Sequence, residues 1–211
     1  MMKRLLAALL LLSTALLGQA QKELLKNSKV TVSQVEIPAN ATVADKHQGD
    51  LLTVIVGKQG KSKLAPGEAF LTPAGAASST RNKGDSPLSA VAVEFASPVG
   101  ARDRHGKADS RYCNPGSKTA CVSEKYLFCT TKVCVEDVRM GAGAVSTKHS
   151  HDTDHMIIAV TDYSLSDDIV GKSVVMRNVK SGGVEYIPAG ITHTLTNKSP
   201  GEVRFVVVVF R

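Results

Sequence analysis

The sequence has no tryptophan and few other aromatic residues: phenylalanine and tyrosine make up 4% of its 211 residues. Proteins that bind single-stranded nucleic acids stack bases on aromatic side chains, so this scarcity argues against such a surface even though the formal net charge is +7. Glycine (17) and proline (8) are also too few for a collagen-like or low-complexity chain. With 43% hydrophobic and 21% charged residues, the composition predicts a soluble globular protein with a buried core.

The sequence also lacks an apolar run long enough to span a membrane. Residues 5–12 are wholly apolar, two basic residues precede them, and residues 18–20 offer small side chains. This layout is typical of a secretory signal peptide, whereas a transmembrane helix needs about 20 apolar residues. We therefore predict a signal peptide at residues 1–20 and a periplasmic or secreted mature chain with no membrane anchor after cleavage.

Cysteine is scarce, and all of it lies within one short segment: Cys113, Cys121, Cys129 and Cys134. In an exported chain an even number of closely spaced cysteines predicts disulfides, here two, with all three pairings left open. The gaps of seven, seven and four residues lack the paired knuckles of a structural zinc site. Residues 101–132 also hold seven basic against three acidic residues, which predicts a solvated, irregular connector.

An internal repeat organises the rest of the chain. Residues 67–95 align with residues 182–210 at a constant offset of 115, without a gap. Nine residues of the first copy meet their own type in the second: Gly67, Pro73, Ala74, Gly75, Asn82, Lys83, Val91, Val93 and Phe95. Short apolar segments separated by turn residues predict antiparallel β-sandwiches or barrels, with one weak helical stretch at residues 21–26.

The second copy carries two histidine motifs. Their residues are Gly143, His149, His151 and His155, then Gly182, Pro188, Gly190, His193 and Asn197. The spacing resembles the two motifs of the cupin superfamily, G-x5-H-x-H-x3,4-E-x6-G and G-x5-P-x-G-x2-H-x3-N. The second motif matches throughout, whereas the first has His155 in place of the usual glutamate and lacks the glycine after it. The resemblance implies an all-β fold of two cupin-type double-stranded β-helix (jelly-roll) units.

The four motif histidines are the predicted metal ligands. His149 and His151 are two residues apart and would share one face of a strand. A turn would bring His155 back toward them, and His193 would face them from a rigid hairpin. Some cupins with histidine at the position of His155 bind metal through four imidazoles. Such ligands suit a divalent transition metal; we favour Fe or Mn, with Ni, Co, Cu and Zn as alternatives.

The first copy is expected to lack a complete ligand set. Aligning Asp50 with His155, an offset of 105, places Ala44 on His149 and Lys46 on His151. The same offset places Pro38 on Gly143, and the offset of 115 places Ser78 on His193. His47 would enter the site if the register slipped by a residue. His47 and His105 are otherwise interpreted as packed or exposed residues without a ligand role, and the first copy as a structural unit.

The sequence thus predicts four segments: a signal peptide (1–20), a degenerate cupin unit (21–99), a basic cysteine-containing connector (100–132) and a metal-binding cupin unit (133–211). The leading hypothesis is a metal-dependent, dioxygenase-like oxidoreductase that acts on a small organic substrate. The alternatives are a non-catalytic metal- or small-ligand-binding protein and a cupin isomerase or lyase. Glu185 and Tyr186 are candidate acid–base groups, although no catalytic residue is assigned; no nucleic-acid partner is expected, and a homo-oligomer is left open.

Overall fold

The computed structural model describes residues 21–45, 47–57, 63–76, 78–103 and 109–211. The predicted signal peptide and His105 lie outside the described residues. Every regular element within the described ranges is a β-strand, which confirms the all-β prediction. These ranges also contain no helix long and apolar enough to cross a membrane.

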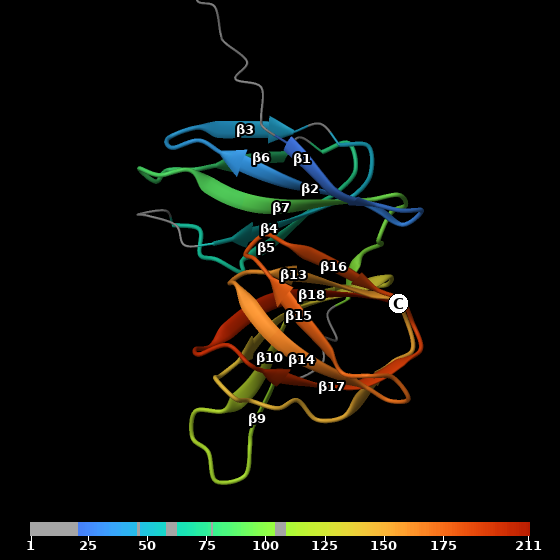
Figure 1. Cartoon of the computed structure of the whole chain (residues 1–211). Coiled ribbons are helices and arrows are strands. Elements are labelled where there is room, and N and C mark those ends of the chain that lie inside the picture. Colours follow the sequence, from blue (N-terminus) through green and yellow to red (C-terminus); the bar gives the residue numbers. More distant parts are fainter. Residues whose placement is uncertain (1–20, 46, 58–62, 77, 104–108) are drawn as a thin grey trace, which may run out of the picture.

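The strands form two units stacked on one another (Figure 1). The first unit has a five-stranded sheet, β1-β2-β7-β4-β5, and a two-stranded sheet, β3-β6. Its strands are β1 (Gln21–Lys26), β2 (Val30–Ile37), β3 (Thr42–Asp45), β4 (Leu51–Val56), β5 (Ala69–Thr72), β6 (Ser78–Arg81) and β7 (Leu88–Phe95). β1 corrects one prediction, because residues 21–26 form a strand paired with β2 and not a helix. The free edge of β2 provides backbone partners that outweigh a weak local preference.

The second unit has a larger sheet, β16-β13-β18-β11-β10-β8, with β9 also paired to β10, and a four-stranded sheet, β12-β17-β14-β15. Its strands are β8 (Arg102–Asp103), β9 (Ser110–Cys113), β10 (Cys121–Thr130), β11 (Val133–Met140), β12 (His149–His151), β13 (His155–Ala159), β14 (Tyr163–Ile169), β15 (Val175–Val179), β16 (Val184–Ile187), β17 (Ile191–Asn197) and β18 (Val203–Phe210). The second half of the segment expected to be an irregular connector is therefore a long strand, β10, of the second unit's sheet. Its apolar residues find a paired position beside β11.

The cysteines form the two predicted disulfides, Cys113–Cys121 and Cys129–Cys134. Each joins directly opposite residues of an antiparallel strand pair: the first bridges β9 and β10, and the second bridges β10 and β11. The sequence leaves the pairing open because it does not show that these segments are neighbouring strands. The disulfides are compatible with the oxidising environment of an exported protein.

The two large sheets pack face to face and share one hydrophobic core. Val32, Val54 and Val93 of the first unit belong to the same buried cluster as Val206 and Val208 of the second. Each unit also has its own inner cluster between its large and small sheets. The apolar faces of the two large sheets are thus covered by one another, which fixes the units as one body.

Equivalent hydrogen bonds reveal the repeat in three dimensions. The buried Asn82 side chain donates to the carbonyls of Ile37, Pro38 and Ser86. The Asn197 side chain makes the same three bonds in the second unit, to the carbonyls of Met140, Gly141 and Gly201. The asparagine that ends the second motif therefore ties two loops together, and Pro38 corresponds to Gly141 rather than to Gly143 as predicted.

Candidate metal centre

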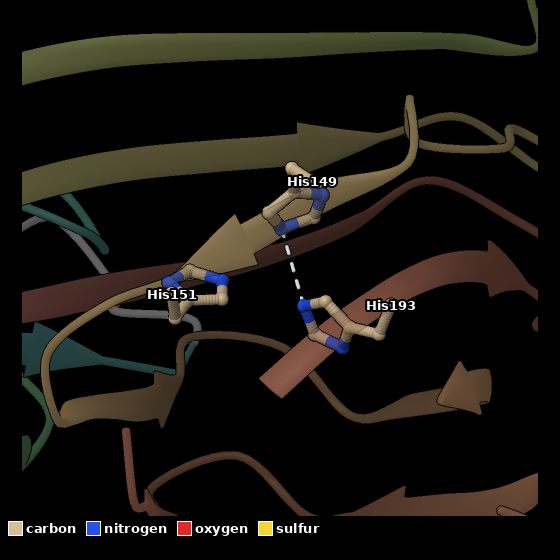
Figure 2. A group of neighbouring side chains, drawn as sticks. All are labelled: His149, His151 and His193. Atoms are coloured by element: carbon tan, nitrogen blue, oxygen red, sulfur yellow. Dashed lines mark hydrogen bonds between the residues drawn. The ribbon is translucent and has the colours of Figure 1, made fainter. Parts of the chain in front are cut away.

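Three of the motif histidines meet at the inner face of the second unit (Figure 2). His149 and His151 lie on β12, and His193 lies on the neighbouring strand β17, directly opposite His149. One nitrogen from each imidazole lies within 4.8 Å of the other two. The alternation of a strand places His149 and His151 on one face, so the H-x-H spacing and the strand register together produce the cluster. In the described part of the chain this is the one cluster of at least three potential metal ligands.

The orientation of two of these rings is fixed through their Nδ1 atoms. His149 Nδ1 donates to the carbonyl oxygen of Thr147 at 2.9 Å, and His193 Nδ1 donates to the carboxylate of Asp167 at 2.7 Å. Neither acceptor can supply a proton, so each neutral ring carries its lone pair on Nε2. The two Nε2 atoms are 3.1 Å apart.

Two lone pairs at this distance repel one another unless a cation lies beside both. Two adjacent ligands of an octahedral ion with metal–nitrogen bonds of about 2.1 Å have their nitrogens about 3.0 Å apart. The 3.1 Å separation of the Nε2 atoms of His149 and His193 is close to that value. The donor set therefore fits a divalent transition metal, which imidazole nitrogen binds well.

The fourth predicted ligand, His155, lies next to the cluster but outside the three-histidine group. It is 1% exposed at the start of β13, and its ring stacks on that of His151 with centroids 3.7 Å apart. Its Nδ1 atom is buried and has no hydrogen-bond partner. An unsatisfied buried nitrogen is costly, so a partner for this ring beside the candidate site would be stabilising. The assignment of His155 as a ligand stays a prediction.

Burial keeps two of these imidazoles neutral. It lowers the pKa of His151 to about 4, and the neighbouring His149 and His193 rings lower it further. Burial, followed by the effect of His151, lowers the pKa of His155 to about 3. Neutral imidazole is the form that binds metal ions, so both rings are in that form at neutral pH.

A buried chain of charged groups extends from His193 away from the cluster. Asp167, which is 0% exposed, accepts from His193 Nδ1 and also from Nε of Arg177 at 2.7 Å. Arg177 donates in turn to Glu185 at 3.0 Å, and Glu185 accepts from the hydroxyl of Tyr163 at 2.8 Å. Burial raises the pKa of Asp167, but the bonds from His193 and Arg177 outweigh it and hold the pKa below its usual value. This carboxylate therefore stays ionised and fixes the His193 tautomer.

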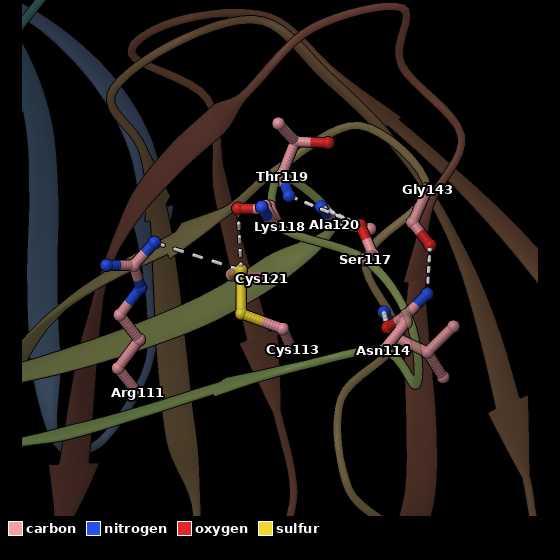
Figure 3. Close-up of a disulfide and its surroundings, with 10 residues drawn as sticks. Arg111, Cys113, Asn114, Ser117, Lys118, Thr119, Ala120, Cys121 and Gly143 are labelled. Carbon is pink, nitrogen blue, oxygen red and sulfur yellow. Dashed lines mark hydrogen bonds between the residues drawn. A yellow bond between two sulfur atoms is a disulfide. The ribbon is translucent and has the colours of Figure 1, made fainter.

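The disulfide-bonded hairpin β9–β10 is hydrogen-bonded to residues 143–147, which lead into the strand that carries His149 and His151. Figure 3 shows the disulfide and the contact with Gly143. The Asn114 side chain, next to Cys113, donates to the carbonyl of Gly143 at 2.9 Å and accepts from the amide of Val145 at 3.0 Å. The hydroxyl of Tyr112 accepts from the amide of Thr147, whose carbonyl holds His149. The cysteine-containing segment thus supports the metal centre.

A cavity of about 450 Å³ opens beside the histidines. The cluster and apolar side chains such as Met140 and Phe205 line it, as do Glu124, Tyr126 and Glu136 of β10 and β11. The Tyr126 phenol is hydrogen-bonded to Glu136; burial and then the charge of Glu136 raise the pKa of Tyr126 to about 12. Sequence reasoning missed Glu124 and Tyr126 because it placed residues 100–132 in a connector. The alternating E-K-Y of residues 124–126 is the signal that would have indicated a strand.

The two acid–base candidates from the sequence do not line this cavity. Glu185 belongs to the chain of charges behind His193, and the Tyr186 hydroxyl donates to Asp154 at 2.6 Å. Asp154 also accepts from the amide of Ala189, so Tyr186 helps to hold the turn before His193. Both residues have structural partners outside the cavity.

The strand registers correct the expected alignment of the first unit by one residue. In the first unit Asp45 pairs with Ser78, and the equivalent pair in the second unit is His149 with His193. Likewise Leu51 pairs with Glu94, and the equivalent pair is His155 with Val209. The offset is thus 104, not 105.

Shared backbone bonds explain this register, because Asp50 accepts from the amide of Ala74 as Asp154 accepts from that of Ala189. Asp45, His47, Leu51 and Ser78 therefore occupy the positions of His149, His151, His155 and His193. One histidine of the four remains in the first unit, and Ala44 and Lys46 are not the equivalents of ligands.

Comparisons with known proteins identify the fold. No family model and no curated protein matches the sequence. Among solved structures, AerE from Microcystis aeruginosa aligns with a TM-score of 0.60 over 92% of this chain and 98% of that chain, at 10% identity. A salicylate 1,2-dioxygenase from Pseudaminobacter salicylatoxidans aligns with a TM-score of 0.59 over 90% of this chain and 76% of that chain, at 11% identity.

A third solved structure bears the name of the fold. A cupin 2 conserved barrel domain protein from Leptotrichia buccalis aligns with a TM-score of 0.53 over 92% of this chain and 89% of that chain, at 12% identity. At such low identity the likeness concerns architecture and not activity. It agrees with the two histidine motifs and with the paired jelly-roll sheets. The chain therefore has the fold of the cupin superfamily.

Proposed function

We propose that the protein is a metal-dependent oxidoreductase of the cupin dioxygenase-like type, acting on a small organic substrate. The observation that carries the proposal is the convergence of the His149 and His193 Nε2 atoms, 3.1 Å apart, with a nitrogen of His151 close by. The fold likeness to a salicylate 1,2-dioxygenase is in keeping with this chemistry.

His149, His151 and His193 would hold the ion, and His155 would join them through its unsatisfied side chain. Fe or Mn is favoured because a redox-active ion, when bound, would activate a chelated substrate toward dioxygen. Four imidazoles add no negative charge to the site, which favours the divalent state of the ion and its attraction for an anionic oxygen of the substrate.

The remaining cavity residues would bind and orient the substrate. A cavity of about 450 Å³ lies at the small end of the range of ligand sites. Met140 and Phe205 provide apolar contact, while Glu124 and Glu136 provide hydrogen-bond acceptors. A substrate with an apolar body and a polar group at each end suits this lining.

The test begins with elemental analysis of the oxidised protein beside the double variant His151→Ala, His193→Ala. Near-stoichiometric Fe or Mn in the parent, lost from the variant, supports the proposal. His47→Gln serves as the control, because it alters the equivalent histidine of the first unit and should leave the metal content unchanged. Metal-free protein after reconstitution, with circular dichroism showing an intact fold, would contradict it.

Oxygen uptake then separates oxidation from the alternatives. Loaded protein that consumes dioxygen with a diketone, catechol-like, thiol or hydroxy-acid compound acts as an oxidoreductase. Substrate loss that persists without oxygen indicates an isomerase or lyase. Binding without turnover indicates a non-catalytic exported binding protein. Two observations favour that last function: Glu124 accepts from Ser110, and Tyr126 is bonded to Glu136. These groups can still contact a ligand, but each already has a partner that would compete with proton transfer to or from a substrate.

A further inference from the structure

The first unit has a cavity of its own, where the second unit has its metal centre. It encloses about 340 Å³. Its lining includes Glu23, Ser33, His47 and Glu94, and the strand registers place His47 at the position of His151. The other three ligand positions have become aspartate, leucine and serine, and the described residues hold no cluster of potential metal ligands here. The cavity thus keeps its place in the fold, with one imidazole where the second unit has four.

A buried imidazole in this cavity has one nitrogen without a partner. His47 is 7% exposed, and its Nδ1 donates to the carbonyl of Gly49 at 2.6 Å. Because that carbonyl only accepts, the neutral ring carries a lone pair on Nε2. The Nε2 atom is buried and has no hydrogen-bond partner. A buried acceptor left unsatisfied costs about 1–3 kcal/mol, so a donor supplied by a ligand would be stabilising.

The loop that carries His47 is held rigidly against the sheet. One carboxylate oxygen of Glu94 accepts from the amides of Gln48 and Gly49, at 2.8 and 2.9 Å. A side chain at Gly49 would collide with the carbonyl oxygen of Phe95, so glycine is required for this approach. The backbone of the loop is therefore fixed before any ligand arrives, which lowers the entropic cost of binding. Because Nε2 itself is buried, the imidazole has to shift within the cavity to accept from a ligand.

The lining is rich in acceptors and carries negative charge. Glu23 and Glu94 contribute two carboxylates, and His47 contributes an imidazole nitrogen. Among the residues that the structure describes, the lining contains no lysine or arginine. The hydroxyl of Ser33 lies directly across from Glu23 on the paired strand. A ligand that complements this lining supplies N–H donors and positive charge.

We propose that the cavity of the first unit binds a small organic cation bearing primary ammonium groups. The ammonium donates to His47 Nε2, and the carboxylates of Glu23 and Glu94 balance its charge. Leu51, which stands at the position of His155 and also lines the cavity, contacts the carbon chain of the ligand. The second unit would then hold the metal and the first an organic ligand.

Calorimetry on the metal-loaded, oxidised protein tests this site with 1,4-diaminobutane as the probe and butane-1,4-diol as its uncharged counterpart. Saturable binding of the diamine at millimolar concentrations, without binding of the diol, is the expected result. Glu23→Gln should weaken binding of the diamine about two- to fivefold, which is the effect of losing one partly exposed charge pair. Glu36→Gln is the matched control, because Glu36 is exposed on the same sheet and does not line the cavity.

Nitrogen-15 spectra of the histidine rings locate the bound probe independently of any variant. The His47 Nε2 resonance should move as the diamine binds, with the affinity that calorimetry gives. Equal binding of the diol, the absence of binding, or an unmoved His47 resonance would each overturn the proposal. So would loss of binding in Glu124→Gln but not in Glu23→Gln, because that result places the diamine in the second cavity.

Discussion

The buried carboxylate behind the metal centre offers a sharp test of how the site is organised. Replacing Asp167 by asparagine keeps the shape of the side chain and removes its charge. His193 Nδ1 then loses a charged acceptor at 2.7 Å, and Arg177 loses the partner of its Nε and Nη2 atoms. Removing one member of a buried ion pair costs about 3–5 kcal/mol. We expect about 3 kcal/mol, because Arg177 keeps its bond to Glu185.

Metal affinity should fall as well, since the His193 ring is no longer held with its Nε2 toward His149. Loss of the partner that orients a histidine ligand weakens metal binding about 10- to 100-fold. Titration of the loaded protein with a competing chelator measures this change, and denaturant unfolding measures the stability. Asp168→Asn is the control, because it removes the same charge one residue later, at an exposed position of the same strand.

A double-mutant cycle distinguishes orientation of His193 from general damage to the fold. If Asp167 acts through His193, Asp167→Asn should change metal affinity little in a His193→Ala background. An equal loss of affinity in both backgrounds would show that the carboxylate only supports the sheet. Unchanged affinity in the single variant, despite lower stability, would refute the reasoning about the tautomer.

Three further outcomes are expected. Because the pKa values of His151 and His155 are lowered to about 4 and about 3, the metal-free unfolded state binds more protons than the folded state below pH 6.5. Thermal melts should therefore show stability that is full above pH 6.5 and falls as the pH drops toward 4; a flat profile would contradict this. Asn197→Ala should lower the free energy of unfolding in urea by about 2–4 kcal/mol, because it removes the hydrogen-bond donor of three carbonyl groups. A loss under about 1 kcal/mol would show that these bonds do not hold the two loops together. Replacing Cys113 and Cys121 by serine should lower the free energy of unfolding by about 2–3 kcal/mol, the value for a disulfide loop of this length. It should also weaken metal binding, which chelator titration would detect. Unchanged metal affinity would show that the disulfide does not support the candidate metal centre.

The sequence predicts the fold because local and long-range patterns agree. Residues 67–95 contain strands β5 to β7, and residues 182–210, which align with them without a gap, contain β16 to β18. The bounds of β5 and β16 differ by 115 residues, and so do those of β7 and β18. Turn glycines explain part of this agreement: Gly75 and Gly190 both have positive φ, 70° and 85°, a conformation that glycine adopts without strain.

The sequence was less informative where the two copies share few residues. Between residues 38 and 50 the first unit keeps only one of the ligand histidines, so the expected alignment was wrong by one residue and placed Lys46, not His47, at the position of His151. Hydrogen bonds of Asp50 and Asp154 to equivalent backbone amides set the register, and such bonds are invisible in one sequence. Glu124 and Tyr126 were missed for a related reason: a basic composition hid a strand that becomes regular only when β11 pairs with it.

One insertion distinguishes the two units. The offset between equivalent residues rises from 104 at β4 and β13 to 115 at β5 and β16, so the second unit gains 11 residues between them. These residues help to form the hairpin β14–β15, which pairs with β17 and carries both Asp167 and Arg177. The buried carboxylate that fixes His193 therefore lies on a segment that is 11 residues longer than its counterpart in the first unit. A transplanted histidine set alone should bind metal poorly in the first unit, because its counterpart of His193 would have no such acceptor.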